Sequence, residues 1–400
     1  MKNTNEKEIK IINVNESRKQ PAPINQLKLD VPERLKATNL FACAGLCEYY
    51  LSDIGVDVVL KNELEPERAL LNHSIFKNST MVIGDITSKE VQDKMAEIAN
   101  REQCKILMMS PKCQQFTKAN THKDPNSNEL FLFEAGLEHL DRVPSYEYLV
   151  IENAEEFKDY HLDKYGDLSV SEHIKEECLK RGFKYFDVDV QNAKDFNTAM
   201  NRARTIIIAA KNKPVKLPEP ITKTPLTLED VICDLPVLES NQRGKHWADV
   251  VGYIPDCQRE QVEITSTGKR VDNPLTKSGN ISNAVHKGAF SRAEWDKPMN
   301  SVLTNNGDLS AYHMIHPGYM IVDKTGKAIL TKDGKKRFTD CRPFTIHEIF
   351  RALRLPDDIR IPNWAKPKTA LIRTIIGECW APLHSQAVIA EIVKAEFGIK

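Results

Sequence analysis

The feature that most constrains the fold is an alternation of short apolar runs with longer amphipathic segments between residues 56 and 210. Runs of this length are typical of buried strands, and the segments between them have the spacing of helices that cover a sheet. Strands alternating with helices predict βα units, a largely parallel sheet and an α/β fold. The apolar runs are VDVVL (56–60), MVI (81–83), KILMM (105–109), YLVIEN (148–153), YFDVDV (185–190) and TIIIAA (205–210).

The composition changes on both sides of this region. Residues 1–36 are polar and charged, and they predict an N-terminal tail. After Lys211 the chain is rich in proline, and residues 225–345 lack the βα rhythm. This part predicts a second domain of strands and loops, with hairpin turns at KTGK and KDGK.

Charge and cysteine usage narrow the classes of function. Lys plus Arg and Asp plus Glu both number 56, so the whole chain is not a uniformly basic nucleic-acid binder, although a local basic face is compatible with this balance. The nine cysteines lack the paired spacing of a zinc site, and they predict reduced thiols and no metal. No run of 18 apolar residues and no signal-like N-terminus is present, which predicts a cytoplasmic protein without a membrane segment.

Cys113 and Glu152 each follow a run that predicts a central strand, KILMM and YLVI. Ligands of parallel α/β sheets bind beyond the carboxyl ends of strands, so both side chains are candidates for one reaction site. A single cysteine is often only a core residue, but a carboxylate at the end of a buried strand needs a partner or a task. A thiolate beside an acid suits covalent addition to an electron-poor ring, as at C6 of cytosine, which turns C5 into a nucleophile. The charge of Lys112 would lower the pKa of the thiol.

The segment SPKCQQFT, the triplet Glu-Asn-Ala that begins at Glu152, and MNRARTIII follow one another in the order found in a known family. The chain resembles the C5-cytosine methyltransferases from about Thr38 to about Ile392. The resemblance implies that Cys113 is the nucleophile and that Gln114 follows it in the catalytic loop.

The same resemblance assigns roles around the base. Glu152 would engage N3 of a flipped-out cytosine, and Asn153 would brace the nucleophile loop. Arg202 and Arg204 would bind O2 of the base and order the site; the simpler alternative is that they are surface charges on an edge strand.

The resemblance also implies a site for S-adenosylmethionine in a Rossmann-like methyltransferase sheet. NLFACAGLCEYYL matches the first loop of the family, KNELEP and IGDIT match the ribose-binding and adenine-binding segments, and GECWAP matches the last motif. The positions implied to bind the cofactor are Phe41, Ala42, Ala44, Gly45, Glu63, Asp85, Ile86, Glu378 and Cys379.

Because the last motif returns to the cofactor pocket in this family, the large domain is expected to be split. We expect a catalytic domain from 37–212 plus 366–400, and a smaller target-recognition domain from 213–365. The chain departs from the family pattern at several positions, which leave the nucleophile, the acid and both arginines in place. The departing residues are Cys43, Leu46, Lys112, Ala154, Met200 and Glu378.

The implied function is transfer of a methyl group to C5 of cytosine in double-stranded DNA by a monomer, in a bacterium or phage-infected cell, as part of restriction-modification. RNA is an alternative substrate, because the SPKCQQFT loop also resembles the tRNA-methylating branch. A degenerate relative that only binds nucleic acid is a further alternative, whereas an NAD-type oxidoreductase is disfavoured because the first loop lacks G-x-G-x-x-G. Basic and aromatic residues between 241 and 300 are candidate DNA contacts, and the alternative is that they form a solvated surface of mixed charge. These residues are Arg243, Lys245, His246, Trp247, Arg259, Lys269, Arg270, Lys277, His286, Lys287 and Arg292.

Overall fold

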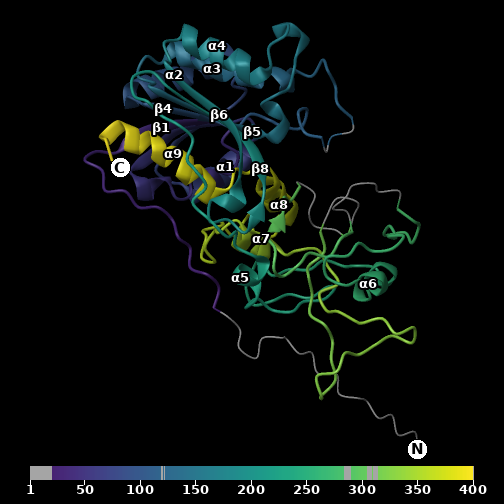
Figure 1. Cartoon of the computed structure of the whole chain (residues 1–400). Helices are drawn as coiled ribbons and strands as arrows, with labels where there is room; N and C mark the ends of the chain where they lie inside the picture. The colour runs from purple at the N-terminus through teal and green to yellow at the C-terminus, as the bar shows by residue number, and fades with distance from the viewer. Residues whose placement is uncertain are drawn as a thin grey trace, which may run out of the picture. The chain divides into compact units, whose positions relative to one another are not determined.

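The structure is a computed structural model that describes residues 20–118, 120, 122–282, 290–303, 309 and 314–399 (Figure 1). The chain forms two compact units. The larger unit comprises Asn25–Thr224, Arg360–Asn363 and Cys379–Lys400. The smaller unit comprises Met1–Ile24, Pro225–Ile359 and Trp364–Glu378.

The larger unit contains a seven-stranded sheet with the order β3-β2-β1-β4-β5-β8-β6. Pairs from β3 to β5 are parallel, whereas β8 runs antiparallel to both β5 and β6. The order reverses between β1 and β4, which is where open α/β sheets bind ligands. The strands are β1 (Leu35–Leu40), β2 (Val56–Glu63), β3 (Thr80–Ile83), β4 (Ile106–Met109), β5 (Tyr148–Ala154), β6 (Tyr185–Asn192) and β8 (Ala203–Ala210), and a two-residue strand β7 (Met200–Asn201) precedes β8.

Helices cover both faces of this sheet. Alternate residues of β4, such as Leu107 and Ile106, enter two separate apolar clusters, as the two-residue period of a strand requires. Helices α2 (Lys89–Glu102), α3 (Leu132–Arg142) and α4 (Val170–Lys180) supply one cluster, and α9 (Pro382–Phe397) supplies the other (Figure 1). Helix α1 (Pro66–Ile75) connects β2 to β3. The predicted fold class is therefore confirmed, with the antiparallel β8 as an addition.

The residues just before β1 already pack against the larger unit. The side-chain amide of Gln386 in α9 accepts a hydrogen bond from the Leu27 N–H at 2.7 Å and donates to the Leu27 carbonyl at 3.1 Å. Leu27, Leu29 and Val31 pack against the cluster on the α9 face. Residues 25–36 therefore belong to the packed unit, although their polarity suggested a tail; residues 1–19 of that tail lie outside the described residues.

His384 is a fully buried histidine at the start of α9. Its Nδ1 accepts a hydrogen bond from the Trp380 indole at 3.1 Å, and its Nε2 lies 3.0 Å from Gln191 Oε1. The indole N–H can only donate, so His384 is the neutral tautomer with the proton on Nε2. Burial lowers the pKa of His384 to about 3, and the nearby Arg204 adds to this effect.

This histidine predicts a loss of stability in acid. An unfolded histidine binds a proton near pH 6.5, so the unfolded state takes up more protons than the folded state between about pH 6.5 and the folded pKa. The contribution of His384 is complete above pH 6.5 and falls by about 1.4 kcal/mol per pH unit below it. Urea unfolding across this range should show a shallower pH dependence for His384→Gln, which keeps a donor and an acceptor, than for wild type. His73→Gln, at an exposed site, should follow wild type.

The smaller unit has little regular secondary structure in its described residues. Two hairpins pair Val322 with Ala328 and Leu330 with Lys336, at the turns that KTGK and KDGK predicted. An apolar cluster that includes Val262 and Ile315 forms its core. The elements of this unit are α5 (Leu228–Ile232), α6 (Asp256–Glu263), β9 (Met299–Asn300), α7 (Ile346–Ala352) and α8 (Thr369–Glu378).

A buried ion-pair network supports the smaller unit. Arg342, which is fully buried, donates to Asp340 Oδ1 at 2.6 Å and to both oxygens of Glu348 at 2.8 and 2.9 Å. Arg292 is also buried, and it donates to the main-chain carbonyls of His316 and Thr339. Buried guanidinium groups thus donate hydrogen bonds to main-chain carbonyls in a unit whose described residues form few paired strands. Arg292 is consequently not a DNA contact, which corrects its inclusion among the candidate basic residues. No helix within the described ranges is long and apolar enough to cross a bilayer.

Candidate active site

Cys113 lies in the loop that follows β4, at the carboxyl edge of the sheet. Its carbonyl accepts hydrogen bonds from Phe116 N at 3.0 Å and Thr117 N at 3.3 Å, so the loop turns directly after the thiol. Phe116 is buried, and its ring packs edge-on against Phe157 at 4.8 Å. Lys112 forms an ion pair with Glu129 at 2.6 Å, which offsets part of the charge expected to act on the thiol.

Glu152 and Asn153 end the neighbouring strand β5 in buried positions. Glu152 Oε1 lies 2.9 Å from Arg204 Nε, and the antiparallel pairing of β5 with β8 holds the two residues near each other. Asn153 Nδ2 donates to the Pro111 carbonyl at 2.9 Å, two residues before Cys113. The end of β5 is therefore tied both to an arginine of β8 and to the loop that carries the thiol.

Arg202 completes this group of charges. It is buried, and its backbone N–H donates to Asn192 Oδ1 at 2.9 Å. Burial and, to a smaller extent, the positive charge of Arg204 lower the pKa of Arg202 to about 10, while Glu152 and Cys113 oppose the shift. The charge of Arg202 is thus influenced by the predicted nucleophile, the predicted acid and the second arginine.

The loop after β1 has an unusual backbone. Phe41, Cys43 and Gly45 have φ angles of 57°, 45° and 71°, in the left-handed region that favours glycine. The Cys43 N–H donates to Glu63 Oε2 at 2.7 Å, and its carbonyl accepts from Asn72 Nδ2 at 3.0 Å. A Cβ on Gly45 would lie 2.7 Å from Asn72 Nδ2, so a larger residue cannot be accommodated there without a shift. Cys43 replaces a family glycine but keeps the left-handed backbone, at a cost in strain.

Replacing Cys43 by glycine should therefore stabilise the protein. A left-handed L-residue costs about 1–2 kcal/mol, and glycine loses about 0.5–1 kcal/mol more in chain entropy, so we expect a net gain of about 0.5–1 kcal/mol. Both hydrogen bonds involve only the backbone of Cys43, so glycine retains them. Urea unfolding of Cys43→Gly measures this gain, and Cys43→Ala is the matched control because alanine keeps the Cβ. Equal stability of both variants would show that the loop is unstrained.

A buried polar network lies beneath the same loop. Lys61, in β2, binds Glu48 at 2.5 Å and Asn72 Oδ1 at 2.9 Å, and its ammonium lies 4.2 Å from the centre of the Phe76 ring. Asn39 Nδ2 donates to Glu48 Oε1 at 2.7 Å. Lys61 and Glu48 are 1% and 3% exposed, so each charge depends on the other for compensation. Through Asn72, this network reaches the Cys43 carbonyl and fixes the loop.

The chemistry of this edge fits S-adenosylmethionine. Glu63 is buried at the carboxyl end of β2, and its oxygens accept from the N–H groups of Cys43 and Glu65. A carboxylate offers about four acceptor positions, so it can also accept hydrogen bonds from ribose hydroxyls. Gly45 caps the 3-10 helix η1 (Leu46–Glu48) with a left-handed backbone.

The other predicted site residues have varied surroundings. Asp85 is exposed and accepts from Thr87 at 2.9 and 2.8 Å, whereas Ile86 is buried in the apolar core. Gln114 is exposed, and its carbonyl accepts from Asn120. Of the remaining positions, Ala42 and Ala44 are buried in the first loop, Glu378 ends α8 in the smaller unit, and Cys379 is a buried residue of the larger unit near Arg202 and Glu152.

Residues 35–394 match the profile of the C-5 cytosine-specific DNA methylase family. The chain belongs to this family. It is a DNA (cytosine-5-)-methyltransferase that uses S-adenosylmethionine, as the sequence motifs implied.

Individual relatives agree with this membership. The type II methyltransferase M1.HgaI of Avibacterium volantium is 29% identical over 370 residues, which cover 90% of this chain and 98% of the relative. A tRNA (cytosine(38)-C(5))-methyltransferase of Schizosaccharomyces pombe is 30% identical over 135 residues, which cover only 32% of this chain and 38% of the relative.

Solved structures share the fold. A protein described as a DNA modification methyltransferase of an E. coli prophage superposes with a TM-score of 0.60 at 15% identity, covering 90% of this chain and 99% of that chain. A Spodoptera frugiperda DNMT2 variant superposes with a TM-score of 0.54 at 13% identity, covering 91% and 99%.

The motifs of the methyltransferase family did not point to Lys61, Glu48 or Asn72. A signal for Lys61 was present, because a lysine in the apolar run VDVVLKNE interrupts a strand that the sheet must bury. Its partner Glu48 could not be identified from sequence, since the two residues meet only when β2 lies beside β1.

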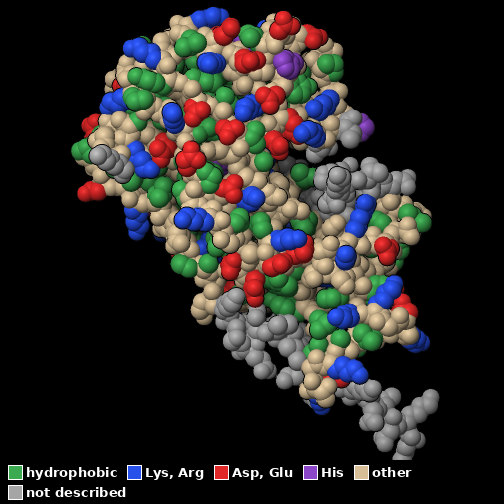
Figure 2. Space-filling model, in the orientation of Figure 1, with side chains coloured by type: hydrophobic (Ala, Val, Ile, Leu, Met, Phe, Trp, Pro, Cys, Tyr) green, Lys and Arg blue, Asp and Glu red, His purple; other side chains and the backbone are tan. Residues whose placement is uncertain are grey.

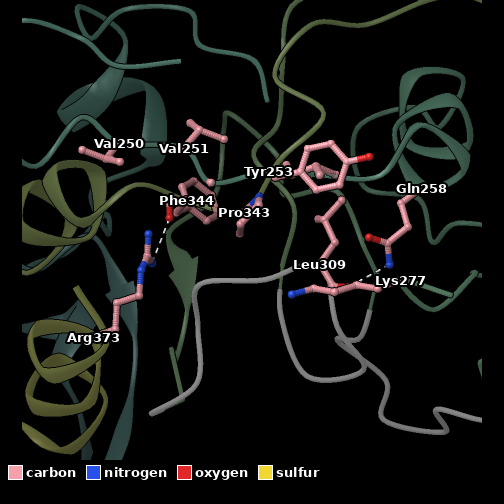
Figure 3. Close-up of a pocket in the computed structure, with 11 residues that line it drawn as sticks. Val250, Val251, Tyr253, Gln258, Lys277, Leu309, Pro343, Phe344 and Arg373 are labelled. Carbon is pink, nitrogen blue, oxygen red and sulfur yellow. Dashed lines mark hydrogen bonds between the residues drawn. The ribbon is translucent and has the colours of Figure 1, made fainter. Parts of the chain in front are cut away.

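The smaller unit of this methyltransferase has a small pocket, with a cavity volume of about 20 Å³ (Figure 3). Arg373 donates to the Phe344 carbonyl at 3.1 Å beside it, and Tyr253 is 66% exposed. On the face drawn in Figure 2, lysine and arginine side chains alternate with acidic ones among the described residues. His286 and Lys287, two of the candidate DNA contacts, lie outside the described residues. The pocket is lined by Val250, Val251, Gly252, Tyr253, Ile254, Gln258, Lys277, Leu309, Pro343, Phe344 and Arg373.

Proposed function

We propose that Cys113 and Glu152 carry out the covalent step of cytosine C5 methylation on double-stranded DNA. The observation that supports this most strongly is the grouping of thiol, carboxylate and two arginines at the ends of β4, β5 and β8. The target base must leave the duplex to reach buried groups, because its C6 is inaccessible within the stack.

The residues act in sequence on the flipped cytosine. The Cys113 thiolate forms a bond from Sγ to C6, and the displaced ring electrons move toward N3. Glu152, oriented by Arg204, stabilises the charge that builds at N3 and supplies a proton there. Arg202 and Arg204 hold the O2 edge of the ring. The enamine formed in this way is nucleophilic at C5.

S-adenosylmethionine, when bound, supplies an electrophilic methyl group, and the first loop, Glu63 and Asp85 are the residues that would hold it. Once C5 carries the methyl group, the C5 proton passes to solvent, the Sγ–C6 bond breaks and its electrons return to the thiolate. The N3 proton returns to the Glu152 carboxylate, which leaves a neutral aromatic base. Asn153 keeps the nucleophile loop in register with the base during these steps through its bond to Pro111.

Sequencing tests this function directly. Bisulfite or nanopore sequencing of DNA from cells that express the protein should show 5-methylcytosine at one recurrent sequence. Modified tRNA with unmodified DNA would instead favour the RNA alternative. The likeness to a bacterial type II enzyme over 90% of the chain supports DNA as the substrate and a restriction-modification context in a bacterial cytoplasm.

We further propose that the pocket of the smaller unit borders the DNA. Lys277 is exposed there, and the ring of Tyr253 offers a stacking surface. Lys277→Ala should weaken DNA binding and reduce the slope of log K against log salt by about one, since one phosphate contact is lost. Fluorescence anisotropy over a salt series measures this slope. Lys94→Ala, which removes an exposed lysine paired with Glu97 on α2, is the control, and an unchanged slope for Lys277→Ala would place the DNA elsewhere.

A further inference from the structure

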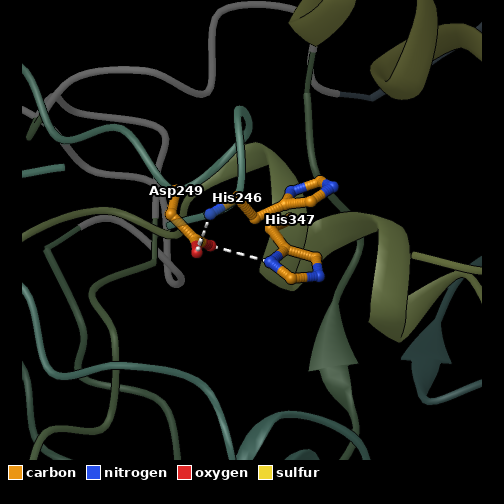
Figure 4. Close-up of side chains that lie close together, drawn as sticks. All are labelled: His246, Asp249 and His347. Carbon is orange, nitrogen blue, oxygen red and sulfur yellow. Dashed lines mark hydrogen bonds and ion pairs between the residues drawn. The ribbon is translucent and has the colours of Figure 1, made fainter. Parts of the chain in front are cut away.

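Three side chains with metal-binding atoms converge in the smaller unit, and none of them is among the residues assigned to methyl transfer. His246 and Asp249 belong to one turn, and His347 lies at the start of α7 (Figure 4). One ligand atom from each of the three residues lies within 4.8 Å of the other two. His347 Nδ1 is 2.7 Å from Asp249 Oδ1, and the two imidazole rings lie 4.1 Å apart between centres.

The outer nitrogens of both histidines bind one residue, Asp357. Nε2 of His347 lies 3.1 Å from Asp357 Oδ1, and Nε2 of His246 lies 3.1 Å from the Asp357 main-chain oxygen. Both oxygens only accept hydrogen bonds, so each Nε2 carries the proton. In the neutral rings, each Nδ1 therefore keeps its lone pair. That of His246 accepts a hydrogen bond from the Ala248 N–H at 3.3 Å, which a bound ion would replace. Metal-binding histidines commonly show this arrangement, in which one ring nitrogen binds the ion and the other donates to a carboxylate or carbonyl.

Surrounding contacts fix the three side chains in place. Asp249 Oδ2 accepts from the His246 N–H at 3.3 Å, and the Asp249 carbonyl accepts from Gly244 N at 2.8 Å. A Cβ at Gly244 would lie 2.6 Å from Asp249, so the turn closes tightly over this carboxylate. Arg351 forms an ion pair with Asp357, which holds the outer hydrogen bonds of both histidines. The ligands are therefore pre-arranged by the fold.

We propose that His246 Nδ1, His347 Nδ1 and the Asp249 carboxylate bind one divalent ion of the zinc class. Two imidazoles and one carboxylate suit zinc, cobalt or nickel, whereas calcium and magnesium prefer oxygen ligands alone. Three protein ligands leave a fourth position for water. In the absence of the ion, a proton shared between His347 and Asp249 occupies the position; the ion displaces that proton, which passes to solvent.

The ion would cross-link the turn that contains His246 and Asp249 to helix α7. The spacing of the cysteines predicted no metal in this chain. The sequence does not indicate this site, because His347 is 98 residues from Asp249. Bound there, the ion would stabilise a unit whose described residues form few regular elements.

Metal content of the purified full-length protein tests the proposal. After dialysis against zinc and then against metal-free buffer, we expect about one equivalent of zinc per chain, and cobalt substitution should give the visible absorption of a four-coordinate ion. His246→Gln, His347→Gln and Asp249→Asn should lose both signals and the zinc-dependent rise in the midpoint of thermal unfolding. His73→Gln, which removes an exposed histidine of the larger unit, should keep them.

His347 and Asp249 are buried, so substitutions there also perturb folding. His246 is only half-buried, so His246→Gln decides the matter. Retention of a full equivalent of zinc by folded His246→Gln would overturn the proposal. A wild-type protein that shows neither zinc after dialysis nor a cobalt spectrum would overturn it equally.

Discussion

Replacing Cys113 with alanine is expected to lower the methylation rate by about 10⁴-fold or more, as loss of the nucleophile does in other covalent enzymes. The reason is that C5 of cytosine becomes nucleophilic only after addition at C6, and alanine has no atom that can add. DNA that contains 5-fluorocytosine provides a second readout. Wild type should form a covalent adduct that persists because the fluorine cannot leave as a proton does, and Cys113→Ala should form none while still binding the DNA.

The matched control is Cys257→Ala. Both thiols are partly exposed, but Cys257 lies on α6 in the smaller unit. This variant should keep wild-type activity and adduct formation. An adduct with Cys113→Ala would mean that another thiol is the nucleophile, and Cys43, Cys47 and Cys379 would be tested next. A wild type that binds DNA and RNA but forms no adduct would instead support the degenerate binding module.

Glu152→Gln is expected to slow methylation by about 10²–10⁴-fold, the range typical of a lost general acid. The amide oxygen of glutamine can still accept from Arg204 at the position of Oε1, so the fold and the base pocket should be preserved. Glutamine cannot carry the proton or the negative charge that addition at C6 requires near N3. Single-turnover kinetics should therefore show a lower rate constant with little change in DNA affinity.

Glu155→Gln, three residues further along, provides the comparison because Glu155 is exposed. It should be fully active. An unimpaired Glu152→Gln would remove the assigned role, and a variant that fails to bind DNA would show that Glu152 acts in binding rather than in chemistry. Circular dichroism of both proteins separates these outcomes from misfolding.

The sequence predicted the strands that carry this chemistry because their apolar runs are short and clearly bounded. The run that predicted a strand at 148–153 became β5 (Tyr148–Ala154), with Glu152 near its carboxyl end. The antiparallel direction of β8 was not predictable from its run, since a buried strand reads the same in either direction. That direction nevertheless places Arg204 opposite Ala154 and close to Glu152.

Contacts between distant residues were the least predictable. The side chain of Gln386 is hydrogen-bonded to the backbone of Leu27, which is 359 residues away in the sequence. Nothing in the polar segment before Leu35 indicates this partner. The boundary of the split domain is a similar case. Residues 366–378 pack within the smaller unit, whereas the sequence placed them in the catalytic domain, because an amphipathic helix does not show which surface it will cover.

The ion pair of Lys61 with Glu48 constrains how this protein can diverge. If a mutation removes the lysine, a lone carboxylate is left in a dry interior, and losing the glutamate strands an ammonium in the same way. Related proteins should therefore replace Lys61 and Glu48 together, for instance by two apolar residues. Proteins in which only one of the two residues has changed should be rare. The two charged residues beneath the loop after β1 should therefore be inherited together.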